Sequence, residues 1–374
     1  MKSIRPLKGD DIPQISALHR RVFGVNGEPA RGPISPEELR DYNEYFEGIF
    51  LRNPWCDETL PSLVSEDATG KITGFLGVLP RRMTHRGRPI RVAISSQFIV
   101  DPDTQTLSAS MGLMKTFLSG PQDLSMTDEA NDTSRKLWEA FGGVTAPLYS
   151  IHWTRLLRPS RYAVSMIGAL SGAGSLASSL LTTSTRPFCN FADAIAARKL
   201  PKHFGLPRPE VEAEELTPEH LLTCLSEFSS TRALWPEYDA SSLRWLLETV
   251  GRKTQSGELR KFALRRAGGA LIGWYIYLLK SGGESNLLQV MAGKGAIGDV
   301  IDHLFHDAWR HGSLSVTGRL EPPFIPVFSD KRCTLRCGTP WFLINSRDAD
   351  LTDSIQRGDA LISKLEGEWC LHFR

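Results

Sequence analysis

The chain has 374 residues, of which 41% are hydrophobic and 23% are charged, and its formal net charge is +2. This length is about twice that of a common domain, so we expect two domains of roughly 150 residues each. The ordinary composition excludes a disordered or fibrous protein, and the balanced charge, without a basic stretch interleaved with aromatics, argues against nucleic acid as the main partner.

The first part of the chain alternates helical and extended patterns. A short strand (SIRPL) precedes a helix that begins near Ile12, and a second helix is predicted over residues 36–50. Three apolar stretches then follow, separated by the turns GKI and HRGRP, and they predict an antiparallel meander. These stretches are LPSLVSED, KITGFLGVLPRRMTH and RPIRVAISSQFIV.

A sharp turn at Asp101 and Pro102 leads from the last of these strands into another helix. This helix places Leu107, Met111, Met114 and Leu118 on one face, and the short strand QDLSM comes after it. A further short helix carries Trp138 and is stopped by the glycines of FGG. LYSIHWTRLL is predicted as the strand that closes this unit.

Residues 158–209 break the pattern and are predicted to be a connector. Within them, the 22 residues YAVSMIGALSGAGSLASSLLTT are nearly uncharged, so we considered a membrane span. Their Gly, Ser and Ala content is too weakly apolar for one, and we expect a connector helix packed between domains. The first residues, MKSIRPLKGDD, lack the apolar region of a signal peptide, which predicts a cytoplasmic location.

From Glu215 the order of elements begins again. Helices are predicted over 217–228 and 240–250, followed by the strands KFALRR, ALIGWYIYLLK and NLLQVMA and by a helix over 297–310. LSVTGRL, WFLIN and GEWCLHF are predicted as late strands. We therefore predict two copies of one topology, with domains at 1–157 and 210–374. The buried face of the 297–310 helix is predicted from its apolar spacing to be Ile297, Val300, Ile301, Leu304, Phe305 and Ala308.

The segment TDEANDTSRKLWEAFGG resembles the GNAT superfamily of acyl-CoA-dependent N-acyltransferases. In that family an Asn after the fifth strand precedes a helix with a "lY-x-x-x-G-F" signature, which Asn131, Trp138 and the FGG at 141–143 match loosely. The V-x-P-x-x-Q at 100–105 resembles the start of the family's pyrophosphate loop. The resemblance implies an α/β (α+β) fold with two GNAT-like domains, each a mixed, mostly antiparallel sheet flanked by helices.

The resemblance also implies acetyl-CoA or another acyl-CoA as co-substrate, no metal, and an amine acceptor on a small molecule, sugar or peptide. Backbone N–H groups at a helix N-terminus, aided by the helix dipole, can hold a pyrophosphate. The family supplies them with Q-x-x-G-x-G, and here serines stand at both glycine positions. The end of the preceding strand would hold the pantetheine amides. We therefore expect acyl-CoA contacts at Phe98, Ile99, Val100, Gln105, Thr106, Leu107, Ser108, Ala109, Ser110 and Asn131.

The acid and base of such a reaction have several candidates. Trp138 stands where many family members have a Tyr that protonates the leaving thiolate, and an indole cannot serve as an acid near neutral pH. Tyr149 either approaches from the next strand or is a buried structural residue. Asp128 and Glu129 at a strand end and His85 in a turn are candidate bases. We assign Glu129 and Tyr149 as the candidate catalytic residues.

Other patterns are weaker. The six cysteines are dispersed and are predicted to be free thiols, and the lone C-x3-C at Cys333 and Cys337 does not predict a zinc site. The G-x-G-x-x-G at 293–298 is predicted to open a helix rather than to bind a dinucleotide, because the strands before it form a meander. Two alternative functions stay open: a catalytically silent GNAT-like binding module and a peptidoglycan-bridge-type aminoacyl transferase. A homodimer is also left open.

Overall fold

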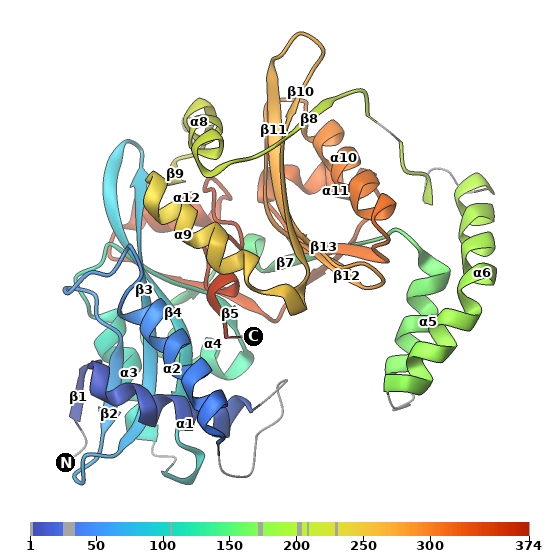
Figure 1. The fold of residues 1–374 in the computed structure, drawn as a ribbon. Helices are drawn as coiled ribbons and strands as arrows, with labels where there is room; N and C mark the ends of the chain where they lie inside the picture. Colours follow the sequence, from blue (N-terminus) through green and yellow to red (C-terminus); the bar gives the residue numbers. More distant parts are fainter. Residues whose placement is uncertain are drawn as a thin grey trace. The chain divides into compact units, whose positions relative to one another are not determined.

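The computed structural model describes residues 3–24, 34–104, 107–170, 175–199, 204–207, 209–228 and 231–373 (Figure 1). The chain divides into two compact units. The first consists of Met1–Ser150, Ser230–Val250 and Thr339–Arg374, and the second of Ile151–Ser229 and Gly251–Gly338. Each unit is built around one mixed β-sheet flanked by helices, as the resemblance predicts.

The sheet of the first unit has the strand order β1–β2–β3–β4–β5–β15–β6, with β9 paired to β3 at one side. Its neighbours are antiparallel except β4 and β5, which are parallel. The predicted meander is therefore present as β2, β3 and β4. The strand bounds are β1 Ser3–Pro6, β2 Leu63–Glu66, β3 Ile72–His85, β4 Arg88–Val100, β5 Leu124–Ala130, β6 Val144–Thr145, β9 Leu234–Pro236 and β15 Trp341–Asn345.

Helices cover both faces of this sheet. Consecutive strand residues point to opposite faces, and Phe75 of β3 contacts the Phe46 and Phe50 rings of α2, whereas its neighbour Leu76 lies in a cluster with residues of α3 and α4. Helices α1 and α2 thus cover one face, and α3 and α4 cover the other. The bounds are α1 Ile12–Phe23, α2 Pro36–Phe50, α3 Leu107–Leu118, α4 Asp132–Ala140, α9 Ala240–Gly251 and α12 Ala349–Gln356.

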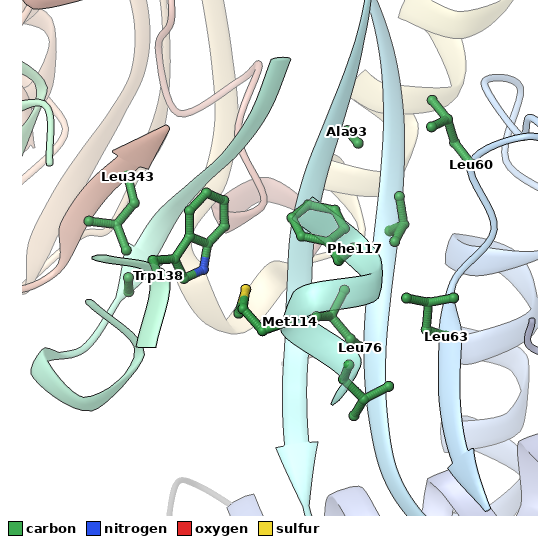
Figure 2. Close-up of a cluster of buried hydrophobic side chains, with 11 residues drawn as sticks. Leu60, Leu63, Leu76, Ala93, Met114, Phe117, Trp138 and Leu343 are labelled. Atoms are coloured by element: carbon green, nitrogen blue, oxygen red, sulfur yellow. The ribbon is translucent and has the colours of Figure 1, made fainter. Parts of the chain in front are cut away.

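The cluster on the α3–α4 face is the part of the core that supports the site. In Figure 2 the indole of Trp138 lies beside Met114 and Phe117 of α3, and the Phe117 and Trp138 ring centroids are 5.8 Å apart. Trp138 is almost fully buried, and Leu343 of β15 belongs to the same cluster. Trp138 is therefore a packing residue that fixes α4 against α3 and the sheet.

The sheet of the second unit repeats this topology. Its order is β14–β7–β13–β12–β11–β10–β8, again antiparallel except for one central pair, β12 and β13. The bounds are β7 Ile151–Leu156, β8 Glu212–Glu215, β10 Glu258–Arg265, β11 Leu271–Leu279, β12 Glu284–Ala292, β13 Ser315–Arg319 and β14 Thr334–Cys337. Read from β1 and from β8, the two sheets match strand for strand, which confirms the predicted fold class.

The helices of the second unit include a pair within the predicted connector. These are α5 (Pro159–Leu170) and α6 (Ser175–Lys199), which contact each other (Figure 1). The others are α8 (Pro218–Phe228), α10 (Ile297–Arg310) and α11 (Ile325–Asp330). None of the helices within the described residues has the length and apolar character needed to cross a membrane.

At one position of the shared topology, each half of the chain supplies a strand to the sheet of the other half. The predicted closing strand LYSIHWTRLL contributes β7, which pairs with β13 and β14 of the second sheet. WFLIN, from the second half, is β15 and pairs with β5 and β6 of the first sheet. The compact units therefore interleave along the sequence, unlike the predicted boundaries at 157 and 210. GEWCLHF is not a strand: it contains a short 3-10 helix, Trp369–Leu371.

Candidate functional site

A pocket of about 290 Å³ opens in the first unit between the carboxyl ends of β4 and β5. These strands pair only from Val92–Leu124 to Ile94–Met126. Beyond Ile94 the backbone edge of β4 that faces β5 therefore has no partner in that strand. The pocket is lined by Ser95, Ser96, Gln97 and Phe98 of β4, Thr127, Glu129 and Ala130 of β5, and residues of α1, α3, α4 and the last residues of the chain.

A β-bulge at Gln97 shapes the β4 wall. Phe75 pairs with Ile99 and Gly77 with Ser96, so Leu76 alone stands opposite the two residues Gln97 and Phe98. Gln97 has φ of 51°, a conformation that few non-glycine residues adopt. A bulge of this kind bends a strand and redirects its side chains. Here it brings four consecutive residues of β4 to the pocket.

Glu129 lies half-buried at the end of β5 and lines the pocket. Burial, with the neighbouring Asp128 carboxylate as a second cause, raises the pKa of Glu129 to about 7. Both effects disfavour the ionised form. A carboxylate with this pKa can accept a proton near neutral pH, which is the property required of a general base.

The last residues of the chain close the pocket beside β5. The Glu368 carboxylate accepts a hydrogen bond from Thr127 Oγ1 at 2.5 Å and lies 3.1 Å from His372 Nε2. The backbone N–H of Glu368 donates to Asp128 Oδ1 at 2.7 Å. A Cβ atom added at Gly367 would come within 2.0 Å of Asp128 Oδ2, so any larger residue would have to displace the Asp128 carboxylate or the nearby backbone. Glu368, His372 and Phe373 thereby reach the pocket.

His19 of α1 lines the pocket next to the last residues of the chain, with its ring centroid 5.8 Å from that of Phe373. Burial lowers the pKa of His19 to about 4, so its imidazole is neutral. Its Nε2 lies 2.8 Å from Gln97 Oε1, and because that oxygen can only accept, Nε2 carries the proton. Nδ1 is then an acceptor, and it is buried without a hydrogen-bond partner. Gln97 in turn donates to the Tyr45 hydroxyl at 3.1 Å.

The candidate catalytic residues Glu129 and Tyr149, the candidate base His85 and the predicted acyl-CoA contact Asn131 fall in different places. Glu129 and Asn131 line the pocket, and the Asn131 side chain also caps α4 by accepting from the Ser134 N–H at 2.8 Å. Tyr149 is not brought to the pocket: it is buried, and its hydroxyl bonds the Ala360 carbonyl at 2.7 Å and the Ala360 N–H at 3.1 Å. His85 is buried elsewhere, with Nε2 at 3.0 Å from Ser354 Oγ.

The predicted acyl-CoA contacts lie along β4 and at the start of α3. Phe98 lines the pocket, Ile99 is buried in the core, and Val100 packs against the core cluster. Gln105 and Thr106 lie outside the described residues. Leu107, Ser108, Ala109 and Ser110 form the first turn of α3, with Leu107 and Ser108 exposed. The residue of α3 that reaches the pocket is Met114.

Comparison with known protein families and solved structures indicates which fold family has this arrangement. Residues 3–123 match the family model of an acetyltransferase (GNAT) domain. Residues 3–123 belong to the GNAT family. The match covers β1 through α3 and so includes the splayed end of β4. Comparison with curated protein sequences gives no match.

Solved structures extend the similarity in fold to most of the chain. A GCN5-related N-acetyltransferase from Anabaena variabilis superposes with a TM-score of 0.58 at 11% identity, covering 93% of this chain and 73% of that one. A probable N-acyltransferase from Enterococcus faecalis gives 0.55 at 8% identity, with 92% and 72% covered. Saccharomyces cerevisiae N-myristoyltransferase with bound myristoyl-CoA gives 0.51 at 10%, with 92% and 79% covered. At these identities the likeness concerns the fold alone.

Sequence reasoning missed His19, Gln97, Glu368 and His372. His19 and Gln97 are separated by 78 positions, and the last residues of the chain were predicted as a strand, so no spacing pattern links them to Glu129. The β-bulge has no local signal because Gln97 is not a glycine. Among the described residues, no group of three or more His, Cys, Asp or Glu side chains is arranged to hold a metal.

The raised pKa of Glu129 predicts a pH-dependent stability. The folded protein holds the Glu129 proton more tightly than the unfolded chain, whose pKa is near 4.5, so stability falls as pH rises from about 4.5 through 7. Glu129→Gln removes this dependence. We expect the variant to equal the wild type in free energy of unfolding at pH 4 and to exceed it by roughly 1–3 kcal/mol at pH 8.5. Urea unfolding at both pH values measures this, and an equal loss at both would contradict it.

Proposed function

We propose that the first unit transfers an acyl group from acyl-CoA to an amine, with Glu129 as general base. The observation that carries the proposal is a carboxylate with pKa near 7 in the gap where β4 and β5 part. The GNAT family uses acyl-CoA as co-substrate. Its pantetheine amides would bond the open backbone edge of β4 at residues 98–100, as one more strand bonds a sheet edge.

The apolar and the acidic residues that line the pocket suit the acyl thioester and the amine, respectively. Phe98, Met114 and Trp138 are apolar and lie on the side of α3 and α4, where the acyl thioester would lie. The carboxylates of Glu129 and Glu368 also line the pocket, and both can accept hydrogen bonds. Carboxylates attract a protonated amine. Glu129 would then accept a proton from this amine, which leaves the neutral amine free to attack the thioester. Holding the amine and the thioester together in a reactive geometry would supply most of the rate enhancement.

Within the described residues of the second unit, the corresponding stretch of β12 is buried. On β12, Leu287, Leu288, Val290, Met291 and Ala292 are all buried, and Gln289 accepts a hydrogen bond from the Trp274 indole at 2.8 Å. This part of β12 follows its short parallel pairing with β13, as the pocket-forming part of β4 follows its pairing with β5. These contacts support the first unit as the acyl-CoA-binding one.

Calorimetry with CoA tests the proposed pyrophosphate position. Ser108 and Gly298 are each the second residue of the matching helices α3 and α10. A carboxylate at Ser108 would occupy the N–H groups meant for pyrophosphate and repel it, while the helix itself accepts Asp in its first turn. We expect Ser108→Asp to weaken CoA binding about tenfold to a hundredfold.

The matched control is Gly298→Asp, where an added Cβ meets no atom within 4 Å outside the backbone of its own helix. It should leave CoA affinity within twofold of the wild type. The reverse ranking would place CoA in the second unit and remove the proposal. If CoA bound as expected but no amine in a broad panel released free thiol from acetyl-CoA, the protein would be a binding module and not an enzyme.

A further inference from the structure

A second cavity, of about 300 Å³, lies within the second unit and shares no residue with the pocket described above. It is bounded by β7, by α10 and by the turn after α11. Figure 1 labels β7, α10 and α11. The residues that line it are Arg155, Gly205, Leu206, Pro207, Asp302, Phe305, Asp330, Lys331 and Arg332. It is away from the open end of the β12–β13 pair, so it does not repeat the acyl-CoA position.

Arg155 is the unusual member of this set. It is only 5% exposed, and its Nε is buried with no hydrogen-bond partner. Burial lowers the pKa of Arg155, but a guanidinium stays charged at any physiological pH. A buried donor that is left unsatisfied is costly, and a buried charge normally has a partner. The buried guanidinium of Arg155, which lines this cavity, thus has no anionic partner within the described residues.

Packing fixes the direction of Arg155. Residues 153 and 155 of β7 share one face of the sheet, and Trp153 contacts Phe328 and Phe305 with ring centroids 4.5 and 5.9 Å apart. This anchors the β7 face against α10 and α11. Phe305 also lines the cavity, so an aromatic surface lies close to the buried guanidinium.

The protein's own carboxylates do not pair with Arg155. The negative charge of Asp302 raises the pKa of Arg155, but the Asp302 carboxylate is ion-paired with Lys331. In the described part of the chain, Arg155 takes part in no ion pair. The neighbouring sequence, residues 199–209, contains no acidic residue. The charged side chains that line the cavity, three cationic and two anionic, leave a single positive charge.

We propose that this cavity binds a small organic monocarboxylate. Its carboxylate pairs with the planar fork of Arg155, which matches carboxylate geometry. Its apolar part rests on Phe305 and Leu206. Asp302 and Asp330 oppose a second negative charge, so a monoanion is favoured over phosphate. The volume is that of a small-ligand site. This site is independent of acyl transfer in the first unit.

Fluorine NMR of 4-fluorobenzoate with the full-length protein tests the proposal. We expect line broadening that titrates to a dissociation constant, and no comparable binding of the neutral isostere 4-fluorobenzamide. Arg155→Met should weaken 4-fluorobenzoate binding at least tenfold, because it removes the charge-assisted hydrogen bonds. The control Arg336→Met, on an exposed residue of β14, should leave binding unchanged.

Several results would overturn the proposal: no binding of 4-fluorobenzoate by the wild type, equal binding of the benzamide, or unchanged affinity in Arg155→Met. Displacement of 4-fluorobenzoate by lower concentrations of inorganic phosphate would identify a phosphate site instead. If Arg155→Met does not fold, as judged by near-UV circular dichroism, Arg155→Lys decides. It keeps the charge but loses the fork, so at least threefold weaker binding is expected, and unchanged binding would contradict the proposal.

Discussion

Glu129→Gln is expected to lower kcat for acyl transfer by about 10²- to 10⁴-fold, the usual contribution of a general base. Glutamine keeps the shape of Glu129 but cannot take the proton of the incoming amine. In the wild type, kcat/KM should rise with pH to a plateau above about 7, because the Glu129 carboxylate must be ionised to act. Thiol release from acetyl-CoA, with any amine that the wild type acylates, measures both quantities.

A matched control exists on α4. Glu139 is an exposed glutamate that pairs with Arg135 at 2.9 Å and accepts from Thr145 Oγ1. Glu139→Gln should change kcat less than twofold. If Glu129→Gln kept more than a tenth of the wild-type kcat, or kept the same pH profile, another group would have to serve as the base.

Gly367→Ala is expected to lower both stability and activity strongly. The added methyl would stand 2.0–2.5 Å from the Asp128 carboxylate atoms, so either that side chain must turn away from the Glu368 N–H that donates to it, or the last residues of the chain must move. Overpacking of this kind typically costs about 1–3 kcal/mol. Displacement would also carry Glu368, His372 and Phe373 away from the pocket, and we expect kcat/KM to fall at least tenfold.

Thermal unfolding and steady-state kinetics of this variant separate the two effects. Gly48→Ala is the control, because Gly48 lies inside α2 with no atom within 4 Å of an added Cβ. Alanine there should stabilise the protein by about 0.4–1 kcal/mol and leave kinetics unchanged. A Gly367→Ala variant with wild-type stability and kinetics would show that the last residues do not build the pocket.

Local patterns in the sequence predicted the elements of this fold well. The helix predicted over 36–50 is α2 with the same bounds, and the predicted buried face of the 297–310 helix is the buried face of α10. Both rest on helical periodicity, which depends only on nearby residues. The repeated order of elements likewise predicted two copies of one topology.

The pairing of strands that are far apart in the sequence could not be predicted from such local patterns. β7 pairs with strands of the second half and β15 with strands of the first half, and the sequence has no local signal for this exchange. For the site, Glu129 could be found from its place at a strand end. His19 and Glu368 could not, because only the folded chain brings them to the same pocket. Tyr149 matched the chemistry of an acid, but its hydroxyl bonds the backbone of Ala360.

Hydrogen–deuterium exchange with and without acetyl-CoA tests most directly the central claim that acyl-CoA binds where β4 and β5 part. The account predicts slower exchange of the backbone amides at residues 96–100 and in the first turn of α3, where the pantetheine and pyrophosphate would be held. Exchange at residues 293–300, before and at the start of α10, should not change. Protection confined to 293–300, or no protection anywhere at saturating acetyl-CoA, would contradict the account.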